Sequence, residues 1–311
     1  MRIGKGRRGA LLSGVALGVV AALLMAAEPA RAADVAEVGV GLPAVDGFNG
    51  KLEGFGGWGD HNAFRGGSHF IGGGLGSLTA PLGHSFGFQL DGMAATRQGD
   101  FVGGAAGHLF TRDPSSHLIG LYGSGVGFDD PSKTRSYKIG AEAEAYLGRF
   151  TLSGVAGYEH VDAKKAFLGL DGAGARVFSD PKDGGSFFDQ IDISFYPTDD
   201  LKLSAGHRYV GRKHAAALGV EALVPVGGVG VSAFAEGRIG EEDYKAAWAG
   251  VKIYFGDDKS LIRRHRESDP PNRLKDDLFA ASNRRDRVGA VPPPPPPPPN
   301  CEVTNCGCVF Q

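Results

Sequence analysis

Charged side chains recur at every second position along several stretches of the chain, opposite a row of apolar residues. Glu142 and Glu144, for example, alternate with Ala141, Ala143 and Ala145. Because successive side chains of a β-strand point to opposite faces, this spacing gathers charge on one face. Charges of both signs around an enclosed lumen can filter solutes, or they can pair with each other and fill the lumen. The candidates for this inward face are Lys51, Glu53, Asp91, Lys138, Glu142, Glu144, Asp192, Lys202, Arg208, Glu221, Glu236, Arg238 and Lys252.

Nucleophilic hydrolysis is the alternative chemistry, since serine, histidine and aspartate are all present. No Gly-x-Ser-x-Gly elbow occurs in the strand–turn–helix context that such a site needs. His117, His160, His207 and His214 fall near the ends of predicted strands, where a solvated histidine is the ordinary explanation. We therefore expect no catalytic residue, no metal site and no cofactor, and we keep a hydrolase as an alternative.

Three cysteines, Cys301, Cys306 and Cys308, lie close to the C-terminus. Their spacing lacks the second ligand pair of a zinc site and the Cys-x-x-Cys-His pattern of haem attachment. In an oxidising compartment, one disulfide plus one free or intermolecular thiol is the ordinary outcome. The last four residues match a prenylation box, which we attribute to coincidence in an exported chain.

The elements that position these residues are twelve short strands between residues 50 and 255. Five tight turns containing Pro, Gly or Asp alternate with other connectors, of which only Asp162–Gly185 is long. Twelve strands place all five tight turns at one end, as in outer-membrane barrels with short periplasmic turns. The predicted strands are 50–59, 68–80, 85–97, 101–112, 117–128, 134–147, 150–161, 186–196, 201–211, 215–225, 229–240 and 244–255.

Aromatic residues on the apolar faces separate a membrane barrel from a soluble protein. With the strand directions above, Trp58 and Tyr137 belong to the outer rim, together with Tyr158 and Tyr209. A secreted soluble β-sandwich binding module is the alternative; it explains the alternation but not two aromatic girdles. The residues expected at the periplasmic rim are Phe86, Phe88, Phe150, Phe195 and Phe255.

The N-terminus has the pattern of a secretion signal. Basic residues precede an apolar run from Ala10 to Ala27, and Ala30-Arg31-Ala32 supplies a cleavage site. Removing residues 1–32 leaves 28 basic and 34 acidic residues. An acidic chain without a basic stripe is a poor nucleic-acid binder, so we expect no nucleic-acid partner.

The secretion signal, the segment Val45–Gly50 and the strand Tyr244–Phe255 together resemble porin-like outer-membrane β-barrel proteins of Gram-negative bacteria. Gly250, Ile253 and Phe255 fit the spacing of the terminal-strand assembly signal, although Trp248 stands where a polar residue is usual. This resemblance covers residues 1–265. It implies a location in the outer membrane, with membrane lipid and the barrel-assembly machinery as partners.

We therefore predict an all-β protein with a single transmembrane antiparallel barrel of about twelve strands. The last strand must pair with the first to leave no open edge in lipid. The predicted function is a porin-like passive pore or a structural membrane protein. The alternatives are an outer-membrane hydrolase built on a barrel and the soluble binding module.

Four regions follow from this interpretation: a signal peptide (1–32), a periplasmic lead (33–49), the barrel (50–255) and a periplasmic tail (256–311). The tail is charged and contains the proline run Pro292–Pro299, which predicts a disordered arm with a polyproline II rod of roughly 25 Å. Such an arm could contact the cell wall or a periplasmic partner.

Overall fold

The computed structural model describes residues 41–60, 68–172, 174–179, 181, 183–226, 229–256, 258–268, 270–280, 282 and 288–291. The predicted signal peptide, the proline run and the three cysteines lie outside these residues. Within them, twelve antiparallel strands close into one barrel. The predicted fold, a single antiparallel barrel of twelve strands, is confirmed.

The barrel strands match the predicted ranges to within a few residues. They are β1 (Asn49–Asp60), β2 (Ser68–Leu82), β3 (Phe86–Arg97), β4 (Asp100–Asp113), β5 (His117–Phe128), β6 (Arg135–Leu147), β7 (Phe150–Asp162), β10 (Gly184–Thr198), β11 (Leu201–Val210), β12 (Lys213–Val226), β13 (Val229–Gly240) and β14 (Lys245–Phe255).

The barrel closes where β14 pairs with β1, in a register that runs from Gly50↔Phe255 to Gly59↔Ala246. The predicted pairing of the last strand with the first is therefore present. Gly57 sits in this seam, and a Cβ atom there would overlap the backbone carbonyl of Ala247. Glycine allows the two backbones to approach this closely.

The outside of the barrel is apolar and the inside is polar. Leu121 and Ile139 expose 61% and 67% of their surface on the outer face. Aromatic side chains are exposed near both rims, among them Trp58 at one end and Phe150 at the other, where Phe150 stacks on Phe195. An apolar exterior around a polar interior is the pattern of a barrel surrounded by lipid.

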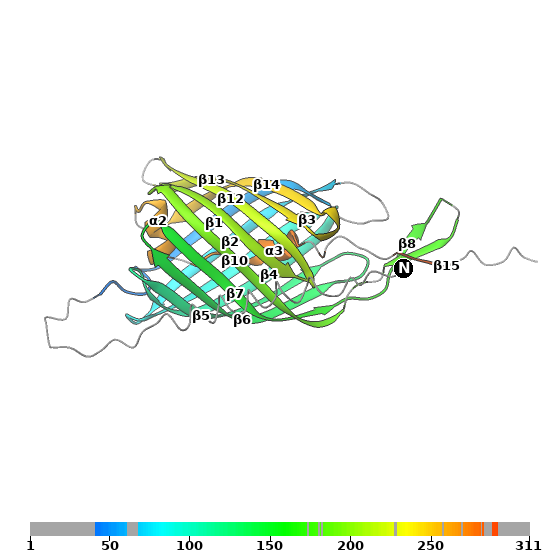
Figure 1. Ribbon diagram of the computed structural model, residues 1–311, viewed down its shortest axis with the longest axis horizontal. Coiled ribbons are helices and arrows are strands. Elements are labelled where there is room, and N and C mark those ends of the chain that lie inside the picture. Colours follow the sequence, from blue (N-terminus) through cyan, green and yellow to red (C-terminus); the bar gives the residue numbers. More distant parts are fainter. Residues whose placement is uncertain are drawn as a thin grey trace, which may run out of the picture.

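The long connector between β7 and β10 contains a small sheet that the sequence did not predict. Its strands are β8 (Phe167–Leu170) and β9 (Arg176–Ser179), and the C-terminal strand β15 (Val288–Val291) pairs with β9. Figure 1 shows β8 and β15 beyond the right-hand end of the barrel, with α2 at the opposite end.

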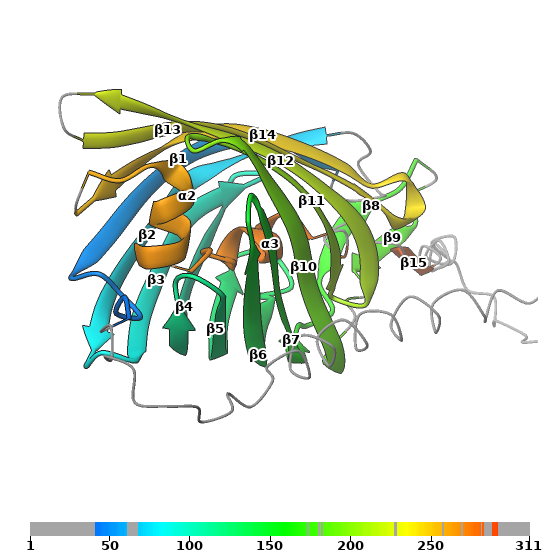
Figure 2. The ribbon, with the colours of Figure 1, turned by 60° about the vertical axis from the view of Figure 1, so that its left-hand side comes forward.

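Residues 258–268 and 270–280 correct the prediction of a disordered tail from residue 256. They form α2 (Leu261–Arg263), a π-helical turn η2 (Arg264–Ser268) and α3 (Leu274–Leu278). Figure 2 shows α2 at the mouth of the barrel and α3 inside it. We call residues 258–280 the plug segment.

The plug segment is ordered because it buries apolar side chains and pairs its charges. Leu261, Leu274 and Leu278 are fully buried. Their burial and the ion pairs described below offset the conformational entropy that ordering costs. A short 3-10 helix, η1 (Glu241–Asp243), connects β13 to β14. None of the helices among the described residues is long and apolar enough to cross a membrane.

The occluded lumen as candidate functional site

The structure places the predicted inward-facing charges on the inner side of the barrel wall. Nine of them are buried and four are partly buried. The buried ones are Lys51, Glu53, Asp91, Lys138, Glu142, Glu144, Arg208, Glu221 and Arg238, and the partly buried ones are Asp192, Lys202, Glu236 and Lys252. Many of them contact the plug segment rather than an open channel.

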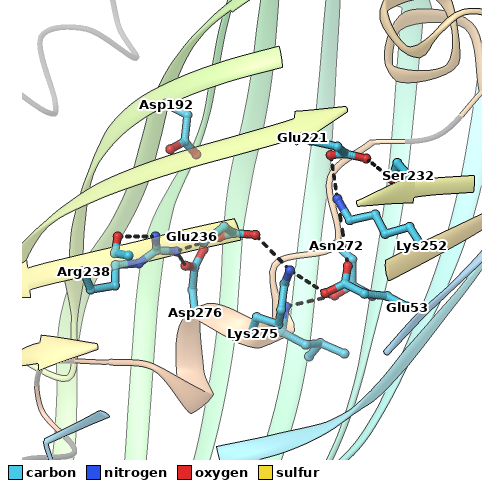
Figure 3. A network of polar contacts seen from close by, with 12 residues as sticks. Glu53, Asp192, Glu221, Ser232, Glu236, Arg238, Lys252, Asn272, Lys275 and Asp276 are labelled. Atoms are coloured by element: carbon cyan, nitrogen blue, oxygen red, sulfur yellow. Dashed lines mark hydrogen bonds and ion pairs between the residues drawn. The ribbon is translucent and has the colours of Figure 1, made fainter. Parts of the chain in front are cut away.

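Lys275 of α3 joins two carboxylates of the wall that are far apart in the sequence. Its Nζ lies 2.5 Å from Oε1 of Glu53 on β1 and 2.9 Å from Oε1 of Glu236 on β13. The same ammonium lies 4.2 Å from the ring centroid of Phe234, within the range of a cation–π contact. Figure 3 shows Lys275 between Glu53 and Glu236.

Asp276 and Asp277 make the opposite pairing with basic residues of the wall. Asp276 accepts hydrogen bonds from Arg208, whose Nε lies 3.0 Å away, and from Arg238. Burial opposes ionisation of Asp276, but these two guanidinium groups outweigh it and hold the pKa of Asp276 well below its usual range. Asp277 pairs with Lys138 on β6. Three consecutive plug residues therefore match wall charges of opposite sign.

Aromatic packing holds the C-terminal end of α3 in place. Phe279 stacks on Trp248 of β14 with a centroid distance of 3.7 Å and an interplanar angle of 12°, and it meets the edge of Phe55 at 5.9 Å. All three side chains are buried. Stacked aromatic pairs contribute roughly 0.5–1.5 kcal/mol beyond the area that they bury.

Turns at the rim of the barrel hold the N-terminal part of the plug segment. The backbone N–H of Leu261 donates to Oδ1 of Asp200 at 3.1 Å, and that of Ile262 donates to the carbonyl of Asp199 at 3.0 Å. Both aspartates belong to the turn between β10 and β11. Arg266 also donates to the carbonyl of Gly148, in the turn between β6 and β7, at 2.9 Å.

His265 sits in the lumen between two tyrosines. Its Nδ1 lies 2.9 Å from the hydroxyl of Tyr196, and its Nε2 lies 3.3 Å from that of Tyr254. Burial is the main cause that lowers the pKa of His265 well below its usual range, and the nearby Lys202 adds to this effect. Docking of the plug segment therefore favours the neutral form of His265.

His108 is a lumen residue that the sequence interpretation missed. Its Nε2 lies 3.0 Å from Oδ2 of Asp91, and its Nδ1 lies 2.8 Å from Oε2 of Glu142. A ring that donates to both carboxylates must carry both protons. Its strand, β4, is rich in glycine and shows no clear alternation, but His108 shares its parity with the charged Arg112, which is a usable signal.

A cavity of about 130 Å³ remains between the plug segment and the wall. Arg273 is buried and its Nε has no hydrogen-bond partner within the described residues. A single water needs only roughly 10–15 Å³, so the cavity has room for several. Its lining has eight basic residues, Lys51, Lys202, Arg208, Arg238, Lys252, Arg266, Arg273 and Lys275, against five acidic ones, Glu53, Glu144, Asp192, Glu236 and Asp276.

A polar chain lies on the outer face of the barrel, where Asp189 is a charge on the face that otherwise carries apolar residues. Oδ1 of Asp189 lies 2.7 Å from Nδ1 of His207, whose Nε2 lies 3.0 Å from Nδ1 of His214. Tyr209 stacks on His214 at 4.4 Å. Among the described residues, no serine, threonine or cysteine is hydrogen-bonded to either histidine. Neither histidine therefore has a nucleophile bonded to it in the described part of the protein.

The proposed assembly-signal residues lie at the end of β14. Ile253 and Phe255 expose 38% and 48% of their surface on the outer face, while Gly250 packs against Phe234 and the carbonyl of Gly54. Their role in assembly stays a prediction. In the described part of the chain, no group of three or more His, Cys, Asp or Glu side chains is placed to hold a metal ion.

Comparisons with known proteins return structural matches only. No family model matches the chain, and no curated protein matches it. The KdgM porin in complex with disordered oligogalacturonate is 9% identical, with a TM-score of 0.44, and covers 66% of this chain and 99% of its own. The COG4313 outer-membrane channel from Pseudomonas putida F1 is 10% identical, with a TM-score of 0.43, and covers 71% and 99%.

The translocator domain of the autotransporter NalP from Neisseria meningitidis is also similar, at 10% identity and a TM-score of 0.43, covering 80% of this chain and 95% of its own. These likenesses are distant. The architecture is read from the molecule itself: twelve strands close on a polar interior and present an apolar exterior. Within the described residues, the chain is a closed antiparallel β-barrel of twelve strands, and its apolar exterior is the pattern of a barrel surrounded by lipid.

Proposed function

We propose that this protein is a non-enzymatic, porin-like channel that its own C-terminal plug segment keeps closed. The barrel supplies the pore, and residues 258–280 occupy it. The observation that carries the proposal is the matched charge pattern of Lys275, Asp276 and Asp277, each of which pairs with opposite charge on the wall. An incidental tail would not need complementary charges on several different strands.

Water and the plug segment can each solvate the charged residues of the wall, so the closed lumen can be opened. When the plug segment leaves, Glu53, Glu236, Arg208 and Arg238 lose these partners and face the lumen. Charged groups that lose a buried partner are strongly destabilised unless water replaces it. The closed state is therefore favoured, and the open state is a hydrated pore with charges of both signs along its wall.

Asp276→Arg tests the proposal in the full chain. A third guanidinium between Arg208 and Arg238 repels both, so the plug segment should dock less tightly. In planar bilayers, the unaltered protein should be closed for most of the recording. The variant should show conductance steps with an open fraction at least about tenfold higher, which corresponds to roughly 1.4 kcal/mol.

Asp129→Arg is the matched control, because Asp129 pairs with Lys133 in an exposed loop outside the lumen. This control should behave like the unaltered protein. A permanently filled lumen, and hence a structural membrane protein, would be indicated if Asp276→Arg folded, inserted and still gave no conductance in any salt. The hydrolase alternative predicts release of fatty acid or peptide that is lost in His207→Ala.

A further inference from the structure

We propose that the C-terminal segment passes through the whole barrel, so that the tail after Val291 is displayed on the outer surface of the cell. This topology goes beyond channel closure and holds whether or not the barrel conducts. It replaces the periplasmic placement of the tail that the sequence interpretation had favoured.

The segment starts at the end of the barrel that carries the tight turns. Phe255 pairs with Gly50, so β14 ends where β1 begins. From there α2 is bonded to the β10–β11 turn through Asp199 and Asp200. Outer-membrane barrels keep their short turns in the periplasm, so the segment begins on the periplasmic side.

The middle of the segment lies within the lumen. Nζ of Lys51 donates to the carbonyl of Pro270 at 3.1 Å, and Nδ2 of Asn272 donates to Oγ of Ser77 at 3.2 Å. Further along, Phe279 stacks on Trp248, only three residues after the opposite end of β14. The contacts therefore move from one end of the barrel toward the other as the residue numbers rise.

The segment reaches the opposite end at Ser282. A Cβ atom placed on Gly211 would overlap the side chain of Ser282, so the two residues are neighbours. Gly211 lies in the connection between β11 and β12, at the end that carries the longer connectors. Strand β15 then pairs with β9 in the longest of them, from Val288↔Ser179 to Val291↔Arg176. Figure 1 shows β15 beyond this end of the barrel.

Chain length permits the crossing. Residues 256–282 comprise 27 positions, which span up to about 90 Å when extended at roughly 3.3 Å per residue. A strand of the twelve residues found in β1 rises about 40 Å along its own axis and less along a tilted barrel axis. The segment can therefore include its helical turns and still reach the far side.

The consequence is that the barrel carries its own C-terminus across the membrane. Pro292–Pro299 and the cysteines beyond them follow β15 directly in the sequence. Because β15 pairs with β9 of the long connector, we infer that the residues that follow it lie outside the cell. A proline run in this position is suited to hold the last residues away from the surface.

Cysteine labelling on intact cells tests this topology. After treatment with a membrane-impermeant reductant, a maleimide attached to a large polyethylene glycol chain should label Cys301, Cys306 or Cys308 without any membrane disruption. On a gel, the fraction of the protein that is shifted by the label should be at least half of the fraction shifted after permeabilisation. Labelling that occurs only after permeabilisation would overturn the proposal.

Two controls in a background with the three native cysteines replaced by serine calibrate the assay. Asp129→Cys, in an exposed connector at the long-loop end, should be labelled on intact cells, whereas Ser115→Cys, in an exposed tight turn, should require permeabilisation. An epitope fused after Gln311 gives a second readout. Antibody binding to intact cells supports display, and binding only to permeabilised cells contradicts it. Neither readout depends on conductance, so display and channel closure are tested separately.

Discussion

Asp189 shows how a single charge is tolerated on the lipid-facing side of the barrel. Its side chain is wholly buried, and His207 contacts its Oδ1 at 2.7 Å. His214 in turn contacts His207, so the polar chain ends toward the rim. One oxygen of the carboxylate thus has a polar partner, whereas Oδ2 is buried with no hydrogen-bond partner among the described residues. The alternation of residue types alone could not reveal this contact.

His207→Ala should destabilise the folded barrel, because it leaves the Asp189 carboxylate buried without its partner. The expected loss is about 1–3 kcal/mol, the usual cost of an unsatisfied buried polar group. It can be measured as a lower midpoint in the heat-induced mobility shift of the barrel in detergent. His160→Ala, at an exposed histidine on the neighbouring β7, should leave the midpoint unchanged.

Asp189→Asn combined with His207→Ala separates the charge from the packing. Removing the charge should recover part of the stability lost in the single variant. If the double variant were no more stable than His207→Ala, the carboxylate would not be the source of the loss.

His265 makes docking of the plug segment depend on pH. Its lowered pKa means that the docked state binds fewer protons than the released state, so docking is strongest above about pH 6.5, the ordinary histidine value, and weakens as pH falls below it. The charged groups that face it are Lys51, Lys202 and Lys252, which favour the neutral ring, and Glu221, which opposes them.

Bilayer recordings at pH 7.5 and pH 5 check this prediction, with more frequent opening expected at pH 5. His265→Gln should remove most of the dependence. The comparison with His265→Gln is needed because burial raises the pKa of Asp277, an effect that strengthens docking as the pH falls. An equal pH response in both proteins would exclude His265 as the titrating group.

At the scale of the element, β14 faces lipid on one side and the lumen on the other. Ile253→Lys would place a charge on the outer face, which costs about 2–4 kcal/mol near mid-depth and less near the rim. It should reduce the amount of folded barrel in the outer membrane. Lys252→Gln should leave assembly intact, because Glu221 still contacts Lys202 and Tyr254. Membrane fractionation distinguishes the two variants.

The strands could be predicted from the sequence because their signals are local. Alternation, tight turns and rim aromatics each involve residues that lie close together along the chain, as in Ala141–Ala145. The plug segment could not be predicted in this way. Lys51 and the carbonyl of Pro270 meet across 219 residues, and Arg208 and Asp276 across 68. From its charged composition alone, the plug segment therefore resembles a solvated tail.

The candidate site shows the same limit. Strand parity was enough to identify inward charges such as Glu53 and Arg238, since the side on which a residue lies is a local property. What those charges contact is set by the path of the C-terminal segment through the lumen. His108, which contacts Asp91 and Glu142, was missed for a different reason. Glycine-rich strands give no clear alternation from which to choose a face.

For the whole molecule, the barrel and its C-terminal segment form one unit. The wall supplies charged residues on β6 and β13, and the plug segment supplies partners of opposite sign in the consecutive residues Lys275, Asp276 and Asp277. A closed lumen is compatible with residence in the outer membrane, because the lipid-facing surface does not depend on what fills the interior.

Cross-linking in intact outer membranes tests the occupied lumen most directly. Ser77→Cys on β2 and Asn272→Cys in the plug segment, in a background with the native cysteines replaced by serine, bring together side chains whose polar atoms are 3.2 Å apart. A short thiol-specific cross-linker should join them in most molecules and alter the mobility of the unfolded chain. A pair of Asn272→Cys with Tyr158→Cys, on the lipid-facing side, should not react. If the Ser77–Asn272 pair reacted no more than this control, the plug segment would not occupy the lumen.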